Sequence, residues 1–353
     1  MLEKGKQIDT SLLDDNNPYQ YINGGISASG YYDKYNTKEN TIIVSEGGAS
    51  CGYVNFMTEK FWCGCHCYRL MEPKVKSEYL YYALKANQHG IMRLRSGCAM
   101  PNIKKSSFYN MQIKLDDNQD NQIKVTSILK KVTTLILKRK EQLTKIDFLV
   151  KSRFLEMFGD PISNSKGWEI TKLEDLGELS RGISKSRPRN LPELLGGKYP
   201  LVQTGDVANS ELYITRYNST YSELGLKQSK MWKAGTLCIT IAANIAKTAI
   251  LKFDACFPDS IVGFKSNGKT NQIFIHYIFS FFQELLESQA PTVAQKNINL
   301  QTLQNLMVIC PPSKFQNDFE SFIQQLDKSK FRIKKSLEKL EMTYKALLQE
   351  YFG

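Results

Sequence analysis

The chain has 353 residues, enough for two or three domains, and its 47 Lys and Arg against 35 Asp and Glu give a net charge of +12. That balance favours a polyanionic partner, with nucleic acid ahead of a membrane surface. Because no run approaches the roughly 18 apolar residues of a membrane span and residues 1–6 lack a signal-peptide core, we expect a cytoplasmic protein without a membrane partner. The eight cysteines include no C-x-x-C pair, so we expect reduced thiols and no metal.

The first part of the chain alternates short strand-like runs with turn residues. Thr41–Val44 and Tyr68–Leu70 have the composition of strands, and Gly, Asn and Ser punctuate the sequence around them. Glu78–Gln88 is predicted to form a short aromatic helix. A long basic helix is predicted to follow, over about residues 120–157.

The second part of the chain repeats the first. Strand-like runs at Leu237–Ile241 and Thr248–Phe253 precede an aromatic helix candidate at Ile273–Leu286, and a second long helix is predicted at about 314–351. Thr41 to Ser45 matches Thr236 to Thr240, and Asn102-Ile103 matches Asn297-Ile298, at one offset of 195 residues (41 to 236, 102 to 297). An offset held over such a distance indicates two copies of one fold.

Each long helix carries one heptad pattern. Apolar positions recur in alternating steps of four and three, which is typical of a coiled-coil seam, and a long basic residue interrupts each seam once, Arg139 in one helix and Lys330 in the other. Because a helix of roughly 55 Å is rarely stable alone, the two seams are predicted to pair, in the simplest case antiparallel with one head at each end. The seam positions are Val125, Leu129, Val132, Ile136, Leu143, Ile146 and Val150, and then Phe319, Ile323, Leu326, Ile333, Leu337, Leu340 and Tyr344.

These patterns predict an α+β protein with two small β-rich α/β heads, separated by two long helices that form an antiparallel coiled coil. The second head opens with Gly167-Trp168 and Leu173–Leu179 before Arg181-Gly182, whereas the first begins near its own equivalent, Lys4-Gly5. The first head is therefore expected to be shortened at its amino-terminal side. The predicted boundaries are 1–115 for the first head, 116–160 for the first helix, 161–312 for the second head and 313–353 for the second helix.

Cys63-Gly64-Cys65-His66-Cys67 has the composition of a metal cluster. Alternation along a strand would place the three thiols on one face and His66 on the other, which makes a poor tetrahedral chelate. The aligned segment of the second copy, Pro258–Val262, contains neither Cys nor His. We therefore expect a buried strand of small thiols rather than a zinc site, with His66 exposed on a surface that would face a nucleic acid.

Two further motifs match known signatures only in part. Asn17-Pro18-Tyr19 lacks the second proline of the adenine-methyltransferase tetrapeptide, and no glycine-rich cofactor loop precedes it, so a simple turn is favoured. Glu46–Ser50 is rich in glycine but lacks the Gly-Lys-Ser/Thr ending of a P-loop. We interpret it as a tight loop between strands that lets the backbone approach DNA closely, with residues 241–247 as its counterpart.

Basic and amide side chains of the heads are the candidate DNA contacts. Arginine pairs with guanine and with phosphate, whereas Asn and Gln pair with adenine. A solvated loop explains the basic run 181–189 equally well, and replacement of both Arg187 and Arg189 is predicted to weaken DNA binding while the fold survives. The candidates are Asn23, Ser27, Tyr32, Ser50, His66, Arg93, Arg95 and Lys104 in the first head, and Arg181, Lys185, Arg187, Arg189, Thr204, Asn244, Lys247, Gln295 and Lys296 in the second.

The order and duplication of several stretches resemble the specificity (S) subunit of a Type I restriction–modification system. The resemblance covers essentially the whole chain apart from the opening of the first head. The matching stretches are Tyr21–Gly25, Gly30–Tyr32, Thr41–Gly52 and Gly97–Ile103 in the first head, and Gly167-Trp168, Leu173–Gly182, Tyr199–Val202, Thr204–Asp206 and Gln295–Ile298 in the second.

The resemblance implies a DNA-recognition subunit that does no chemistry itself. Each of two target recognition domains would read one half of a bipartite double-stranded site, with the helix pair fixing their separation. The chain would bind no cofactor. It would dock methyltransferase subunits, expected to be two, that bind S-adenosylmethionine, and in the full complex also ATP-driven restriction subunits.

Two other interpretations stay open at this stage. A stand-alone DNA methyltransferase or nuclease would need a cofactor loop or a cluster of acidic metal ligands, and the sequence contains neither pattern. A coiled-coil scaffold without DNA recognition would explain the helices but not the two basic, glycine-punctuated heads.

Overall fold

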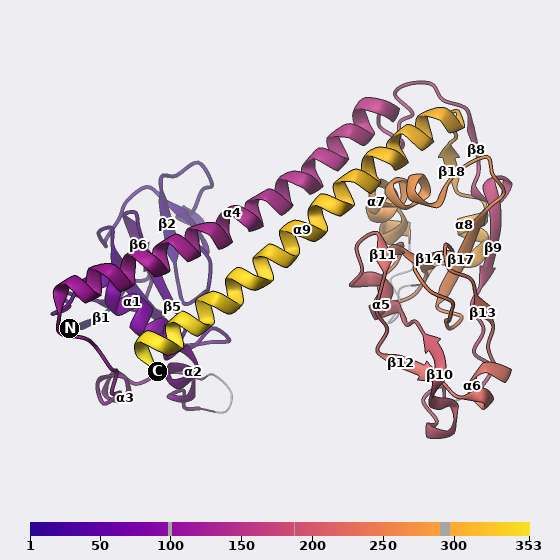
Figure 1. The fold of residues 1–353 in the computed structure, drawn as a ribbon. Helices are drawn as coiled ribbons and strands as arrows, with labels where there is room; N and C mark the ends of the chain where they lie inside the picture. Colours follow the sequence, from indigo (N-terminus) through magenta and orange to yellow (C-terminus); the bar gives the residue numbers. More distant parts are fainter. Residues whose placement is uncertain (98–100, 187, 290–296) are drawn as a thin grey trace. The chain divides into compact units, whose positions relative to one another are not determined.

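The computed structural model describes residues 1–97, 101–186, 188–289 and 297–353. The chain separates into two compact units: Met1–Leu143 with Arg332–Gly353, and Thr144–Phe331. Each unit combines a head of short strands and helices with parts of two long helices, α4 (Gln119–Phe158) and α9 (Ser313–Phe352), each of 40 residues (Figure 1). This content confirms the predicted α+β class. None of the described helices is long and apolar enough to cross a membrane.

The head of the first unit is built on a four-stranded antiparallel sheet in the order β1-β7-β4-β5. In a second, smaller sheet, β2 pairs in parallel with β6 and antiparallel with β3. Its elements are β1 (Leu2–Lys4), η1 (Thr10–Leu12), β2 (Tyr19–Ile22), β3 (Gly30–Tyr32), β4 (Thr41–Ser45), β5 (Val54–Met57), β6 (Phe61–Cys63), β7 (Cys67–Leu70), α1 (Ser77–Ala86), α2 (Gln88–Arg93) and α3 (Lys105–Tyr109).

The head of the second unit contains a five-stranded sheet in the order β11-β15-β14-β17-β9, a four-stranded sheet in the order β12-β10-β16-β13 and the pair β8-β18. Its elements are β8 (Ile170–Lys172), η2 (Leu173–Leu176), β9 (Gly177–Arg181), η3 (Pro192–Leu194), β10 (Leu195–Leu201), α5 (Thr204–Ala208), β11 (Tyr213–Ile214), β12 (Ser219–Tyr221), α6 (Glu223–Lys227), β13 (Met231–Trp232), β14 (Leu237–Thr240), β15 (Thr248–Leu251), β16 (Ala255–Cys256), β17 (Ile261–Ser266), α7 (Gln272–Gln289), α8 (Leu300–Gln304) and β18 (Met307–Ile309).

The two heads share one topology. The order β9-β17-β14-β15 in the second repeats β1-β7-β4-β5 in the first. The parallel pair β10 and β16 repeats β2 and β6, and β12 lies where β3 lies. Strand β11 extends the second sheet at one edge, and among the described residues of the first unit no strand corresponds to β8. The repeat read from the sequence is therefore a repeat of structure.

The long helices pair antiparallel within each unit. In the first unit, Leu129 of α4 packs in one cluster with Leu348 and Phe352, near the end of α9. In the second, the Phe154 and Phe158 rings of α4 each lie 5.5 Å from the ring of Phe319, near the start of α9. Every predicted seam residue is buried or half-buried, because the alternating four- and three-residue steps keep one apolar stripe toward the partner helix.

The predicted continuous strand through Cys63 and Cys67 is wrong. Strand β6 ends at Cys63 and β7 begins at Cys67, in different sheets, and a turn joins them. A Cβ atom on Gly64 would lie 2.4 Å from the Asn23 Oδ1 atom, so the chain passes Asn23 where only glycine fits. Cys63 and Cys67 are buried, whereas Cys65 is half-buried in the turn and His66 is exposed.

Candidate nucleic-acid interface

The loop between β4 and β5 of the first unit is joined to the segment that follows α2. The Gly48 N–H donates to the Pro101 carbonyl at 3.1 Å, and the Ile103 N–H donates to the Glu46 carbonyl at 2.9 Å. Gly48 and Gly52 have φ values of 78° and 85°, in the left-handed region that favours glycine. Two segments distant in sequence thus form one surface of exposed backbone and short side chains.

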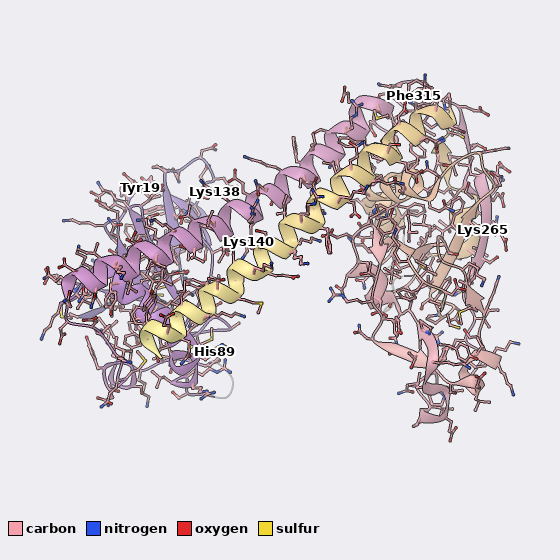
Figure 2. All side chains as sticks on the ribbon, viewed as in Figure 1. Tyr19, His89, Lys138, Lys140, Lys265 and Phe315 are labelled. Carbon is pink, nitrogen blue, oxygen red and sulfur yellow. The ribbon has the colours of Figure 1, made fainter. Side chains whose placement is uncertain are left out.

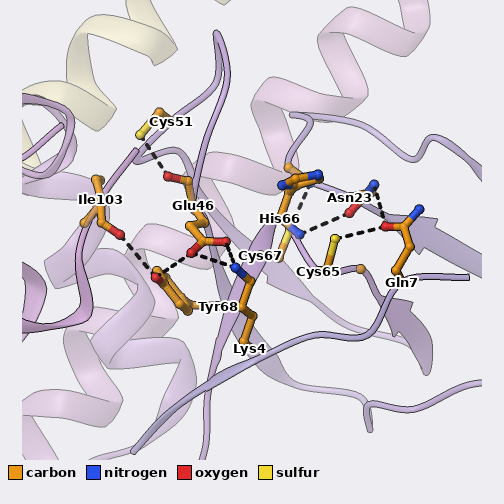
Figure 3. A network of polar contacts seen from close by, with 12 residues as sticks. Lys4, Gln7, Asn23, Glu46, Cys51, Cys65, His66, Cys67, Tyr68 and Ile103 are labelled. Atoms are coloured by element: carbon orange, nitrogen blue, oxygen red, sulfur yellow. Dashed lines mark hydrogen bonds and ion pairs between the residues drawn. The ribbon is translucent and has the colours of Figure 1, made fainter. Parts of the chain in front are cut away.

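Glu46 stabilises the base of this loop (Figure 3). Its carboxylate, with 15% of the side chain exposed, accepts from the Tyr68 hydroxyl at 2.7 Å and pairs with the Lys4 ammonium at 2.7 Å. Burial raises the pKa of Tyr68, and the Glu46 carboxylate raises it further, so the hydroxyl remains a donor. The loop is therefore anchored by a charge-assisted network rather than by apolar packing alone.

The turn that carries His66 adjoins the same loop. The Glu46 N–H donates to the His66 carbonyl at 2.8 Å. The His66 N–H donates to Asn23 Oδ1 at 3.1 Å (Figure 3). A Cβ atom on Gly24 would meet the His66 Cβ at 3.0 Å and the Gly47 carbonyl at 3.7 Å. The side-chain amide oxygen of Asn23 thus holds the turn, while the His66 imidazole is left exposed.

Several predicted contacts of the first head therefore converge. Ser50 lies in the glycine loop, and Lys104 follows the segment that bonds to it. An isolated bridge between Ser96 and Asn102 brings the exposed Arg95 to the same place, and exposed Arg93 ends α2. Ser27 lies instead in the loop between β2 and β3, and Tyr32 ends β3 of the smaller sheet, where its ring packs edge-on against that of Trp62 at 5.0 Å.

The second head repeats this arrangement with different side chains. The Ile241 N–H donates to the Ser260 carbonyl at 3.0 Å, and the Ile298 N–H donates to the Ile241 carbonyl at 3.0 Å. Buried Ile241 thus replaces Glu46. Ala243 and Ala246 have φ values of 65° and 59°, which is strained for residues other than glycine and is a feature of functional loops.

The tip of this second loop exposes Asn244, whereas Lys247 points back toward helix α7, where its ammonium donates to Gln283 Oε1 at 3.0 Å. Arg181 donates to the Asp259 carbonyl at 2.8 Å, and Arg189 pairs with the Asp259 carboxylate. Asp259 thus contacts both Arg181 and Arg189 and holds the two predicted arginines near each other.

The remaining predicted contacts of the second head divide into two groups. Lys185 is exposed, and Thr204 is half-buried as the first residue of α5. Arg187, Gln295 and Lys296 lie outside the described residues.

Sequence reasoning missed Glu46 and Tyr68 as supports of the interface. Glu46 opens the glycine-rich run and Tyr68 opens a strand-like run, but neither side chain was singled out, because the bond between Lys4 and Glu46 spans 42 residues of sequence. The available signal was a difference between the copies, a charged Glu46 where the second copy has Ile241. Within the described ranges, no three His, Cys, Asp or Glu side chains gather closely enough to hold a metal ion.

The long helices carry much of the positive charge. Helix α4 contains nine Lys and Arg against four Asp and Glu, and α9 contains eight against six. Lys138 and Lys140 project from α4, and the Lys140 ammonium pairs with Glu341 of α9 at 3.2 Å (Figure 2). The two helices thus contribute +5 and +2 of the net charge of +12.

Comparison with known proteins identifies the family. The chain matches the model of the type I restriction modification DNA specificity domain over residues 1–146 and 165–342. It belongs to this family. The two matched ranges of the specificity domain follow the internal repeat.

Curated relatives carry related names. A putative type I specificity subunit of Mycoplasma genitalium is 31% identical over 214 residues, which is 58% of this chain and 55% of that protein. A putative type I specificity subunit of Mycoplasma pneumoniae is 31% identical over 186 residues, 51% of this chain and 49% of that protein. The chain thus spans about half the length of the curated relatives it matches.

Solved structures share the fold. The type I restriction–modification S subunit from M. genitalium superposes with a TM-score of 0.62 at 21% identity, covering 100% of this chain and 93% of that one. A chain from a structural study of type I restriction–modification complex assembly superposes with a TM-score of 0.56 at 14% identity, covering 99% and 91%. At these identities the likeness concerns the fold.

Proposed function

We propose that this chain is the DNA-reading subunit of a type I restriction–modification complex. One observation carries the proposal: a single fold occurs twice, and each copy presents a tight loop beside exposed polar and basic side chains. Each head would read one half of a bipartite double-stranded site through base edges, while Lys and Arg bind phosphates. The specificity-domain family supports this assignment.

The chain itself would be non-catalytic and would bind no cofactor. It would dock methyltransferase subunits, two in number, that bind S-adenosylmethionine and modify adenine, and in the full complex also restriction subunits that use ATP. The exposed lysines of α4 and α9 would face either these partners or the phosphates of the DNA between the half-sites. Binding of S-adenosylmethionine to the purified chain alone, measured calorimetrically, would contradict the non-catalytic assignment.

The proposal is tested by co-purifying the chain with the methyltransferase encoded beside it and mapping adenine methylation on DNA exposed to the complex. We expect one bipartite motif with a constant gap. A single half-site, or a palindrome of one half-site, would mean that one head is silent. Absence of both complex and methylation would overturn the proposal.

Paired variants assign the heads to the half-sites. Replacing Arg95 and Lys104 with Ala should relax one half of the motif, and Asn244→Ala should relax the other, since the two loops lie in different heads. Lys38→Ala, an exposed lysine away from the loop, serves as the control and should leave the motif unchanged.

A further inference from the structure

Lys330 interrupts the apolar seam of α9 within the second unit. Its side chain is only 17% exposed. The ammonium lies 2.7 Å from the Asp147 carboxylate of α4 and 3.0 Å from the Glu211 carboxylate. Glu211 belongs to the head, between α5 and β11. One cation thus joins three elements: both long helices and the recognition head.

The Lys330 side chain stays protonated and positively charged at neutral pH. Burial alone would lower its pKa, but the bonds to Asp147 and Glu211 outweigh burial and raise the pKa above its usual value. Half-buried ion clusters of this kind contribute little net stability, since desolvation offsets attraction, whereas a lone polar residue in a seam selects one register. Asp147 and Glu211 are 64% and 52% exposed, so removal of Lys330 would leave no carboxylate buried.

Apolar side chains do not completely fill the space between the helix pair and the head of the second unit. A cavity of about 550 Å³ lies beside the cluster, between the helix pair and the head of the second unit. Its walls include Phe154 of α4, Tyr277 of α7, Leu326 of α9 and Lys330. Close packing normally fixes how two packed elements are oriented. Where packing is incomplete, directional contacts such as ion pairs are needed to fix that orientation.

The first unit lacks this cluster at the corresponding place. Buried Ile136 aligns with Lys330 at the offset of the helices (136 to 330), and Arg139, the other basic seam residue, donates to Gln142 of its own helix at 2.8 Å. Glu211 precedes β11, and the described residues of the first unit place no strand at that edge of its four-stranded sheet. The three-way contact is therefore particular to the second head.

We propose that Lys330 is a positioning residue that fixes the orientation of the second head on its helix pair, and thereby the fidelity with which this head reads its half-site. The inference rests on the proposed function. A head free to tilt would keep its phosphate contacts but would lose the alignment of its base contacts, so selectivity would fall more than affinity.

The test compares adenine-methylation maps made by the full chain in complex with its methyltransferase. In Lys330→Met the apolar seam is completed and the two carboxylates remain in water. We expect selectivity against single mismatches in the second half-site to fall about tenfold, within the range of couplings in one ion-pair network. Selectivity in the first half-site should be unchanged, which a general loss of folding would not produce. Lys330→Arg keeps the positive charge and should retain the selectivity of the parent chain. Lys328 is an exposed lysine of the same helix, and Lys328→Met should also match the parent chain.

Glu211→Gln provides a second variant that leaves the seam intact. It should reproduce the loss in the second half-site, and the double variant with Lys330→Met should lose no more than either single change. A parent complex with a bipartite motif whose second half is read equally well by Lys330→Met and Glu211→Gln would overturn the positioning role alone. A parent complex without a bipartite motif would instead overturn the proposed function.

Discussion

Glu46 is a charged residue at a position where the second head has buried Ile241, and it links Lys4, Tyr68 and the loop backbone. Replacing it with Gln keeps an acceptor for Tyr68 but removes the ion pair with Lys4. We predict a loss of about 1 kcal/mol, since a charge-assisted hydrogen bond is stronger than a neutral one by roughly that amount. Hydrogen exchange of residues 46–53 should report the change. Glu39→Gln, at an exposed position of the same head, is the control, and equal protection in both variants would contradict the role of Glu46.

We predict that His276 makes the stability of the second unit depend on pH. Burial lowers its pKa to about 4, and its Nδ1 lies 2.9 Å from the Thr248 hydroxyl. Because the unfolded state, with a pKa near 6.5, binds a proton more readily, stability should be full above pH 6.5 and decline as the pH falls toward 4. The difference between these pKa values corresponds to about 3 kcal/mol.

The pH dependence is measured by urea denaturation of the full chain between pH 7 and pH 4, with hydrogen exchange to separate the units. His276→Gln should flatten the profile of the second unit over this range. A profile of His276→Gln as steep as that of the parent would exclude His276 as the source.

At this scale the sequence predicted residue types better than residue roles. His66, Arg95, Lys104 and Ser50 were chosen for their chemistry, and the topology brings them together. Asn23 was chosen as an adenine contact, yet its side-chain amide oxygen accepts from the His66 N–H and holds the turn. Such roles depend on partners distant in sequence, as Asn23 and His66 are, and no local pattern reveals them.

At the scale of the elements, each long helix has a buried glutamine in its first turn. Gln316 is 1% exposed in the first turn of α9, and Gln122, 194 residues earlier (316 less 122), is 4% exposed in the first turn of α4. The Gln122 amide donates to the Asp116 carbonyl at 2.8 Å. The Gln316 side-chain amide donates through Nε2 to the Pro311 carbonyl at 2.7 Å, and its Oε1 accepts from the Thr270 hydroxyl at 2.8 Å. Both glutamines tie a helix start to the segment before it.

We predict unequal costs for the two matched substitutions. Gln316→Leu should cost about 3 kcal/mol, because it leaves buried partners of both its donor and its acceptor unpaired, and Gln122→Leu about 1 kcal/mol. Denaturation followed by hydrogen exchange in each unit would measure both costs. Equal losses would show that the extra bonds of Gln316 add nothing.

Apart from the strand through Cys63 and Cys67, the helices and strands named from the sequence are present with bounds within a few residues, whereas several other short strands were not predicted. The seam predicted helices at about 120–157 and 314–351, and they span Gln119–Phe158 and Ser313–Phe352. Thr41–Val44 was predicted within one residue of β4, because a buried run of β-branched residues strongly favours a strand. The two-residue strands β11 and β13 and the turn at Gly64 follow from tertiary contacts, which a local pattern does not encode.

At the scale of the whole molecule, the charge lies mainly on helices, with α4 and α9 contributing seven of the net twelve positive charges (+5 and +2). DNA affinity of the complex should therefore fall steeply with salt, by about a thousandfold or more between 50 and 200 mM for six or more phosphate contacts. Fluorescence anisotropy with a short duplex measures the slope. A salt-independent affinity would place these lysines away from DNA.

The division into units has a consequence for how the chain is made. The core of the first unit includes Leu348 and Phe352, and the Phe352 ring lies 5.2 Å from that of Tyr79. During synthesis, the first head emerges from the ribosome long before these residues do, whereas the second unit is complete once Phe331 has emerged. The head that is translated first is therefore expected to finish folding last, and until then its aromatic surface on α1 is a natural client for chaperones.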